Sequence, residues 1–364
     1  MVTAKRFADL ELHRFCIEAL SKLNVPDGEA RSTADALAYA DLRGIDSHGI
    51  AHLGRYVRAI RSGAYAVERE IVVVHETPST ALIDGGYGLG FTAAVRSMEL
   101  AITKAEAVGS SWVATRNSHH FGAAGYYASM ALPHDMIGIC ITNAGPAVVP
   151  TFGLRAQIGT NPIAIAVPAD KEPPYVLDMA TSVKAIGKIE ILIRDGAEAP
   201  SDWFLQADGS TGGDPQRFIS ALHGEGLGGQ LPLGGCGEQT SGYKGFGLGL
   251  GIEILSSILT GNVASPFMPP RRADYAPAIA HLFGAIRVDA FRPAAEFKAD
   301  VDRILAQIKA SPKAAGHDRI WVAGEKEHVI LQERRDLGVP LHTEVVQELN
   351  TIAVDLDIPL PEIK

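Results

Sequence analysis

The chain has 364 residues, 46% of them hydrophobic and 21% charged, which indicates a globular protein large enough for two domains. Asp and Glu number 42 against 33 Lys and Arg, so the formal net charge at pH 7 is −9. This acidic balance, with no basic run longer than a pair, argues against nucleic acid as a partner.

Cysteine usage and hydropathy point to the cytoplasm. The three cysteines, Cys16, Cys140 and Cys236, are too scattered for a disulfide framework or a paired metal motif. The N-terminal residues lack the apolar core of a signal peptide, and the apolar, glycine-rich stretch 245–261 carries Glu253 in its middle. We therefore expect a cytoplasmic protein that is not embedded in a membrane.

Three helices are predicted in the first sixty residues. Apolar side chains recur at helical spacing from Leu12 to Leu23, and a second helix is expected from Asp27 to Gly44. A third helix is expected to begin with Ser47 as its N-cap and to end near residue 63. This interpretation places His48 in the first turn of a helix.

The pattern changes at residue 70, where we place a domain boundary. Strands are predicted at 71–74, 80–83, 112–114 and 137–142, and helices at 92–107 and 123–132. Two further strands, IAIAV and YVLDM, lie between 159 and 178 and precede a helix at 183–193. Such alternation of strands and helices is typical of an α/β layer architecture.

The remainder of the chain continues the same alternation. Residues 194–229 are polar and glycine-rich and are predicted to form a loop. A helix at 244–259, a strand at 281–288, a helix at 294–308 and a strand at 320–322 follow, and two last helices end near residue 354. The GxGxxG string at 224–229 follows a helix-like stretch, so it does not indicate a Rossmann fold.

Two short motifs suggest a site built from histidines. In RGIDSHG, residues 43–49, Ser47 and a glycine flank His48, and His52 and Tyr56 follow at helical spacing. The second motif, NSHHFG at 117–122, holds His120 between a strand and a helix, where α/β folds usually bind ligands. Each histidine alone is more often structural, but the two motifs together favour an enzyme site.

Other chemistry fits these motifs less well. His48 and His52 share a helix face and could bind a metal, but the chain has no HExxH and no nearby cysteine ligand. Ser47 lacks the GxSxG turn of a serine hydrolase. We therefore predict no metal.

Three further segments carry groups that could bind a polar ligand, and each has an ordinary structural alternative. The turn with Thr160 and Asn161 is equally a strand connection, and the carboxylate and hydroxyls of 178–182 could hold ribose or cap a helix. Lys244, at a glycine-rich helix start after Tyr243, could bind phosphate or simply be solvated.

In order along the chain, these segments resemble the type-2 malate/L-lactate dehydrogenase family, the sulfolactate dehydrogenase-like oxidoreductases. The resemblance runs through nearly the whole chain and rests on RGIDSHG, NSHHFGAAGYY, VVPTFG, GTNPIAIAVP, LDMATS, LPLGG, GYKGFGLGLGIEIL and HLFGAI. It implies NAD- or NADP-dependent interconversion of 2-hydroxy acids and 2-oxo acids by a homodimer. The implied fold is a non-Rossmann α/β layered sheet with an N-terminal helical domain.

The resemblance also implies roles for individual residues. His48 and His120 match the family's two site histidines, of which one protonates the developing alkoxide and the other orients the substrate; members differ in which is named. The residues implied or inferred to contact substrate are Ser47, His52, Tyr56, Thr160 and Asn161. Those implied to contact the cofactor are Ala144, Asp178, Met179, Ala180, Thr181, Ser182, Tyr243, Lys244, Gly324, Glu325 and Lys326.

The chain departs from the family pattern at three positions. His52 stands where relatives often carry an arginine, His119 replaces an asparagine, and Ala323 replaces a proline. Because imidazole cannot reproduce the bidentate grip of arginine on a carboxylate, the departure at His52 leaves the substrate open.

The sequence therefore predicts a 2-hydroxy acid dehydrogenase acting on a small molecule. Some relatives reduce cyclic imines or oxidise ureidoglycolate, and a non-catalytic protein that binds dinucleotide or small acids is a further alternative. We expect residues 1–69 to pack with 325–364, and residues 70–324 to form the cofactor-binding domain.

Overall fold

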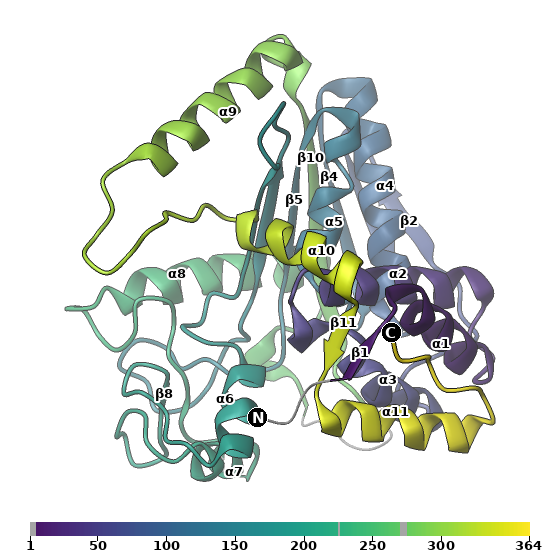
Figure 1. Cartoon of the computed structure of the whole chain (residues 1–364), viewed down its shortest axis with the longest axis vertical. Helices are drawn as coiled ribbons and strands as arrows, with labels where there is room; N and C mark the ends of the chain where they lie inside the picture. The colour runs from purple at the N-terminus through teal and green to yellow at the C-terminus, as the bar shows by residue number, and fades with distance from the viewer. Residues whose placement is uncertain (1–4, 225, 270–274) are drawn as a thin grey trace.

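The computed structural model describes residues 5–224, 226–269 and 275–364, and its centre is a seven-stranded sheet. The strands follow the order β2-β3-β4-β10-β5-β6-β7 (Figure 1). Only β3 and β4 run parallel among these neighbours. Their bounds are β2 Val72–Glu76, β3 Thr80–Asp84, β4 Ser110–Ser118, β5 Met136–Thr142, β6 Ile163–Val167, β7 Tyr175–Met179 and β10 Ile279–Arg287.

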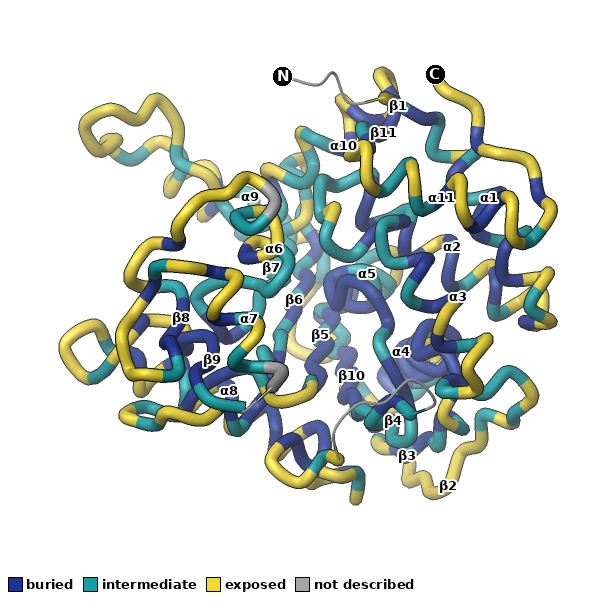
Figure 2. Tube along the Cα trace, turned by 90° about the horizontal axis from the view of Figure 1, so that it is seen from below, coloured by how far each residue is buried: buried dark blue, intermediate teal, exposed yellow. Residues whose placement is uncertain are grey.

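Helices cover both faces of this sheet (Figure 2). On one face, α4 (Gly90–Val108) and α5 (Ala124–Ser129) bury alanine and aromatic side chains against β4, β5 and β10. Alanine permits the close approach, and a Cβ on Gly138 of β5 would overlap the carbonyl of Ala128 in α5. On the other face, Ile252 of α8 (Gly242–Glu253) packs on Leu282, and the π-helical turn η4 (Ile254–Ile258) follows directly.

The two ends of the chain form one helical layer. The helices are α1 (Asp9–Ser21), α2 (Asp27–Leu42), α3 (Leu53–Arg61) and α11 (Thr343–Leu356), and their apolar faces share one core. Phe15, Leu20 and Leu53 from the N-terminal helices meet Leu349 and Ile352 of α11 in it. Strand β1 (Lys5–Phe7) pairs antiparallel with β11 (Val339–Leu341) and so joins the two ends. The proposed division into two domains, with boundaries near 69 and 325, stays a prediction.

The prediction that residues 194–229 form a polar loop is wrong in part. The structure places α6 (Ile186–Asp195) before it and α7 (Pro215–Gly224) within it, together with the short pair β8 (Phe204–Leu205) and β9 (Gly229–Gln230). Phe204 and Phe218 stack at 4.2 Å and pack with Ile189 in a small separate core. Of the GxGxxG string, Gly224 ends a helix and Glu225 lies outside the described residues.

The C-terminal third differs from the prediction at one strand. Helices α9 (Ala294–Ala310) and α10 (Glu325–Leu337) are present, but residues 320–322 form no strand. They instead lead into α10, where the amide of Glu325 donates to the carbonyl of Val322. The short strands β1 and β11 were not anticipated, because three residues are too few to show a period.

The remaining predicted elements are confirmed to within a few residues, except that the third helix, α3, begins at Leu53 and not after Ser47. Single 3₁₀ turns complete the structure: η1 (Asp46–His48), η2 (Ile50–His52), η3 (Leu132–His134), η5 (Ser265–Phe267) and η6 (Val288–Ala290). Across the described residues, every helix is too short or too polar to cross a bilayer.

The contact between β5 and α5 gives a stability prediction. Gly138→Ala places a methyl group against the Ala128 carbonyl, so it should lower the free energy of unfolding by about 1–3 kcal/mol. Gly247→Ala in α8 is the matched control, because a Cβ there meets nothing within 4 Å and should raise helix stability by about 0.5–1 kcal/mol. Urea denaturation measures both; equal stabilities for the two variants would contradict this packing.

Candidate active site

The prediction that His48 lies in the first turn of a helix is wrong, because His48 lies in a loop. Two 3₁₀ turns, η1 and η2, precede α3, which begins only at Leu53. Gly49 between the turns has an extended backbone, with ψ at −153°, and a Cβ there would overlap the carboxylate of Asp41. That carboxylate accepts the backbone N–H of Ile50 at 2.8 Å. The hydroxyl of Ser47 caps no helix and instead lies 2.9 Å from Nδ1 of His48.

An arginine from the C-terminal end fixes the same loop. Arg334 of α10 donates from one nitrogen to the backbone carbonyl of Asp41 and to the carboxylate of Asp46, both at 2.5 Å. Arg334 is 9% exposed and Asp41 is 3% exposed, so these groups are held inside the protein. One side chain therefore ties the end of α2 to the turn η1 that carries His48.

The two neighbouring histidines after β4 have different surroundings. The ring of His119 is buried and stacks on Tyr65, with centroids 4.1 Å apart. The next residue, His120, turns toward the N-terminal helices, where the Tyr56 hydroxyl lies 2.7 Å from its Nδ1. His119 is thus a core residue, and His120 is the one available to a ligand.

Three imidazoles meet where the helical layer contacts the sheet. The ring of His48 lies 5.4 Å from that of His120 in a stacked arrangement, and the ring of His52 lies 5.9 and 5.3 Å from these two. Gly187 in the first turn of α6 closes in on Ser47, since its Cβ would lie 3.3 Å from that of the serine. The structure therefore brings together four of the predicted residues, Ser47, His48, His52 and His120, with Tyr56 behind them.

The hydrogen bonds fix which nitrogen of His120 carries a proton. The backbone N–H of Gly122 donates to Nδ1 of His120 at 3.4 Å, so this nitrogen is an acceptor. The Tyr56 hydroxyl then also donates to it, and burial raises the pKa of Tyr56, which keeps that proton on the oxygen. Neutral His120 accordingly carries its hydrogen on Nε2.

All three imidazoles are neutral at pH 7. Burial, together with the positive charge of Arg55, lowers the pKa of His48 to about 4. Burial also lowers the pKa of His52 to about 3 and that of His120 well below its usual value. A neutral imidazole can accept a proton or donate a hydrogen bond, which suits acid–base chemistry on a bound hydroxyl or carbonyl.

Thr160 and Asn161 lie in a second polar cluster. Asn161 is fully buried, and its amide donates to Glu253 at 2.8 Å and to the Gly249 carbonyl, while its oxygen accepts the N–H of Ala144. The backbone carbonyl of Thr160 accepts from Thr181. The side chain of Asn161 is thus occupied within the protein, which favours a positioning role over the predicted contact with substrate.

The predicted cofactor residues after β7 are also largely engaged by the protein. Asp178 accepts the N–H of Gly125 at the start of α5, a helix distant in sequence, and not an N–H of the helix that follows it; burial raises the pKa of Asp178 to about 6. The hydroxyls of Thr181 and Ser182 donate to backbone carbonyls. Met179 ends β7, and Ala180 follows it, both partly exposed.

Two helix starts carry the remaining predicted cofactor residues. Tyr243 and Lys244 are exposed in the first turn of α8, and the ammonium of Lys244 lies 5.8 Å from the tyrosine ring. Gly324 lies against Val176 of β7, so the start of α10 adjoins the same edge strand as Asp178. Lys326 is exposed beside Trp321.

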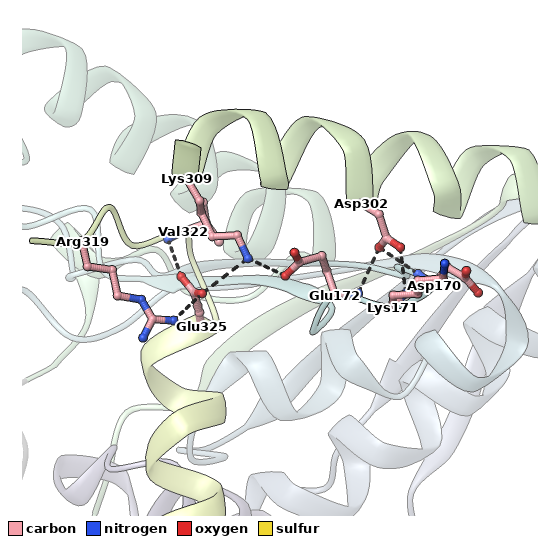
Figure 3. A network of polar contacts seen from close by, with 8 residues as sticks. All are labelled: Asp170, Lys171, Glu172, Asp302, Lys309, Arg319, Val322 and Glu325. Carbon is pink, nitrogen blue, oxygen red and sulfur yellow. Dashed lines mark hydrogen bonds and ion pairs between the residues drawn. The ribbon is translucent and has the colours of Figure 1, made fainter. Parts of the chain in front are cut away.

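Glu325 is part of a network of ion pairs (Figure 3). Its carboxylate accepts from Arg319 at 2.6 Å and lies 3.6 Å from Lys309 of α9, which also pairs with Glu172. The carboxylate therefore ties α9 to the start of α10 and is not free for a ligand.

Sequence reasoning missed three groups that shape this site. Glu253 was noticed only as a charge within an apolar stretch, and a lone carboxylate at such a place is a signal for a buried network. Arg55 lies three residues after His52, a spacing that shares one helix face. Nothing local could have paired Arg334 with Asp46, because they are 288 residues apart.

Comparison with known proteins agrees with this architecture. Residues 7–350 match the family model described as malate/L-lactate dehydrogenase. The chain is 43% identical to a malate dehydrogenase of Pyrococcus horikoshii over 94% of this chain and 93% of that protein, and 38% identical to an L-sulfolactate dehydrogenase of Methanocaldococcus jannaschii over 96% of each. The solved structure of malate dehydrogenase from Entamoeba histolytica is similar with a TM-score of 0.95, at 34% identity, covering 99% of this chain and 100% of that one.

The contact between Tyr56 and His120 gives a prediction for the isolated protein. Tyr56→Phe removes one of two donors to Nδ1, so nitrogen NMR of the imidazoles should show this nitrogen shifting toward a non-bonded value. The free energy of unfolding should fall by about 0.5–1.5 kcal/mol. Tyr39→Phe, which loses a hydroxyl contact to Ser129, is the control and should leave the His120 signals in place. Unchanged His120 signals in Tyr56→Phe would refute this arrangement.

Proposed function

This chain belongs to the malate/L-lactate dehydrogenase family, and we propose that His48 and His120 together carry out the proton chemistry of its reaction. The protein is an oxidoreductase that interconverts 2-hydroxy acids and 2-oxo acids with NAD or NADP. The observation that supports the role of the two histidines is their stacked arrangement, 5.4 Å apart, at the contact between the helical layer and the sheet.

The first turn of α8 is the part of the structure that best fits a dinucleotide. The ammonium of Lys244 is exposed in the first turn of α8, at the positive end of the helix dipole, and this combination suits a phosphate. The bound cofactor supplies the hydride acceptor for oxidation and the hydride donor for reduction. The predicted cofactor contacts at Ala144, Asp178–Ser182 and Gly324–Lys326 stay part of this proposal.

The two histidines take different roles in this mechanism. Because Nδ1 of His120 is filled by Tyr56 and Gly122, His120 presents Nε2–H and donates a hydrogen bond to the oxygen on C2. Nδ1 of His48 faces the Ser47 hydroxyl, which can accept its hydrogen and leave Nε2 with a lone pair. His48 then accepts the hydroxyl proton as the hydride leaves C2, and returns it to the oxygen in the reverse reaction.

The alternative activities are less well supported. The relatives of 38% and 43% identity carry the names of hydroxy acid dehydrogenases, which disfavours a cyclic-imine or ureidoglycolate enzyme. Three neutral imidazoles around one point suit acid–base chemistry, which favours catalysis over binding alone.

We also propose a cytoplasmic homodimer. Large apolar side chains lie exposed along α8 and η4, among them Leu255, Ile258 and Leu259 at 48%, 54% and 61% exposure. An apolar helix face of this kind is typical of an interface between subunits. All three cysteines are unpaired, and the exposed thiol of Cys236 favours a reducing compartment.

Substitution of the two histidines tests their roles. His48→Ala and His120→Ala should each lower kcat by about 10²–10⁴-fold while cofactor binding, followed by fluorescence of NADH and NADPH, changes little. Turnover is measured with oxaloacetate, pyruvate, sulfopyruvate and cyclic imines, each with NADH and with NADPH. His134→Ala is the control, because His134 is exposed and pairs with Glu106 away from the cluster. Near-normal turnover by both site variants would overturn the assignment.

Asparagine variants separate the two roles. An asparagine can donate a hydrogen bond but cannot exchange a proton, so His120→Asn should keep at least about tenfold more activity than His120→Ala. His48→Asn should be as inactive as His48→Ala. The reverse pattern would exchange the two roles.

The dimer is tested by light scattering after gel filtration. The wild type should have twice the mass of one chain, and Ile258→Asp should shift it toward the monomer because a charge would be buried in the interface. Val354→Asp on α11, where the side chain is 82% exposed and lies away from η4, should remain dimeric. A monomeric wild type would exclude this assembly.

A further inference from the structure

We propose that Arg55 binds the carboxylate next to the reacting carbon of the substrate, and thereby makes the site selective for 2-oxo and 2-hydroxy acids over their uncharged derivatives. The inference rests on the proposed function, because it concerns the substrate of that same site. It concerns a residue that sequence reasoning did not single out.

Arg55 lies beside the imidazole cluster. Arg55 lies in the first turn of α3, three residues after His52, and therefore on the same helix face as His52. It directly precedes Tyr56, whose hydroxyl contacts His120. Its positive charge acts on all three imidazoles, whereas no carboxylate does so. Among the described residues, the three imidazoles are therefore exposed to the positive charge of Arg55, and no carboxylate balances it.

The other arginines of α3 are balanced, and Arg55 is not. Arg58 pairs with Glu348 at 2.6 Å and Arg61 with Asp355 at 3.2 Å, both across the contact with α11. Among the described residues Arg55 forms no ion pair, and its Nε is buried without a hydrogen-bond partner. A buried guanidinium nitrogen left without an acceptor costs free energy, which a bound anion would recover.

The chemistry of a 2-oxo acid matches this arrangement. Its carboxylate is bonded directly to C2, so a group that binds the carboxylate must lie close to the groups that bind the oxygen on C2. Guanidinium is the side chain best suited to hold a carboxylate, through two parallel hydrogen bonds. With His48 and His120 on the C2 oxygen, Arg55 is, among the described residues, the cation whose charge acts on both rings.

The test separates binding of the carboxylate from turnover. Oxamate, a non-reacting analogue of pyruvate, is titrated by calorimetry into the protein saturated with NADH or NADPH. Arg55→Gln should raise its Kd, and the KM for pyruvate and oxaloacetate alike, by about 100-fold, while cofactor affinity stays within about threefold. Arg55→Lys should be intermediate, because it keeps the charge and loses the paired geometry.

Arg58→Gln is the matched control, since it removes the same charge one turn further along α3. It should bind oxamate as the wild type does. A second readout is the preference of the enzyme for pyruvate over its methyl ester. Arg55→Gln should lose this preference, whereas a loosened fold would lower the activity on both compounds alike.

Three results would overturn the inference: oxamate binding by Arg55→Gln within about threefold of wild type, equal losses in Arg55→Gln and Arg58→Gln, or a retained preference for the acid over its ester. A loss confined to oxaloacetate would also overturn it, because the distal carboxylate would then be the one bound. Failure of the wild type to turn over any 2-oxo acid overturns the proposed function instead, and oxamate binding still decides the role of Arg55.

Discussion

The loop that carries His48 depends on Arg334, which comes from the other end of the chain. One guanidinium binds the carbonyl of Asp41, where α2 ends, and the carboxylate of Asp46, where the loop begins. The Asp41 carboxylate in turn holds Ile50, just beyond Gly49. Because a buried guanidinium must keep its acceptors, α10 and the loop cannot separate without a large cost in free energy. The position of His48 is therefore set by the packing of the C-terminal helices on the N-terminal ones.

A buried carboxylate organises the sheet side in the same way. Glu253 is 2% exposed and accepts hydrogen bonds from Asn143, Asn161, Ser257 and both the amide and hydroxyl of Ser265. It thereby joins the loop before β6 to the end of α8, where the helix widens into a π turn. Two buried side chains, Arg334 and Glu253, thus hold by hydrogen bonds the two halves between which the imidazoles lie.

The fold was predictable wherever an element is long enough to show a period. Helices such as α1 and α4 bury one face, and a strand such as β10 is apolar along most of its length. Both patterns are visible in the spacing of apolar residues along the sequence. The elements that were missed, β1, β8, β9, β11 and α7, are short or polar. They exist because of partners distant in sequence: β1 pairs with β11, and Phe218 of α7 packs on Phe204.

The two histidine motifs, the α/β alternation and, through the ordered set of motifs, the family could all be recognised from the amino-acid sequence. The family motif singled out His120, but the sequence could not show where its neighbour His119 points, because the stacking of His119 on Tyr65 is a tertiary contact. Nor could it show that Asn161 is enclosed or that Arg55 is left without a counter-charge. Burial and charge balance are properties of the assembled layers, because they depend on side chains that packing brings together from distant parts of the chain.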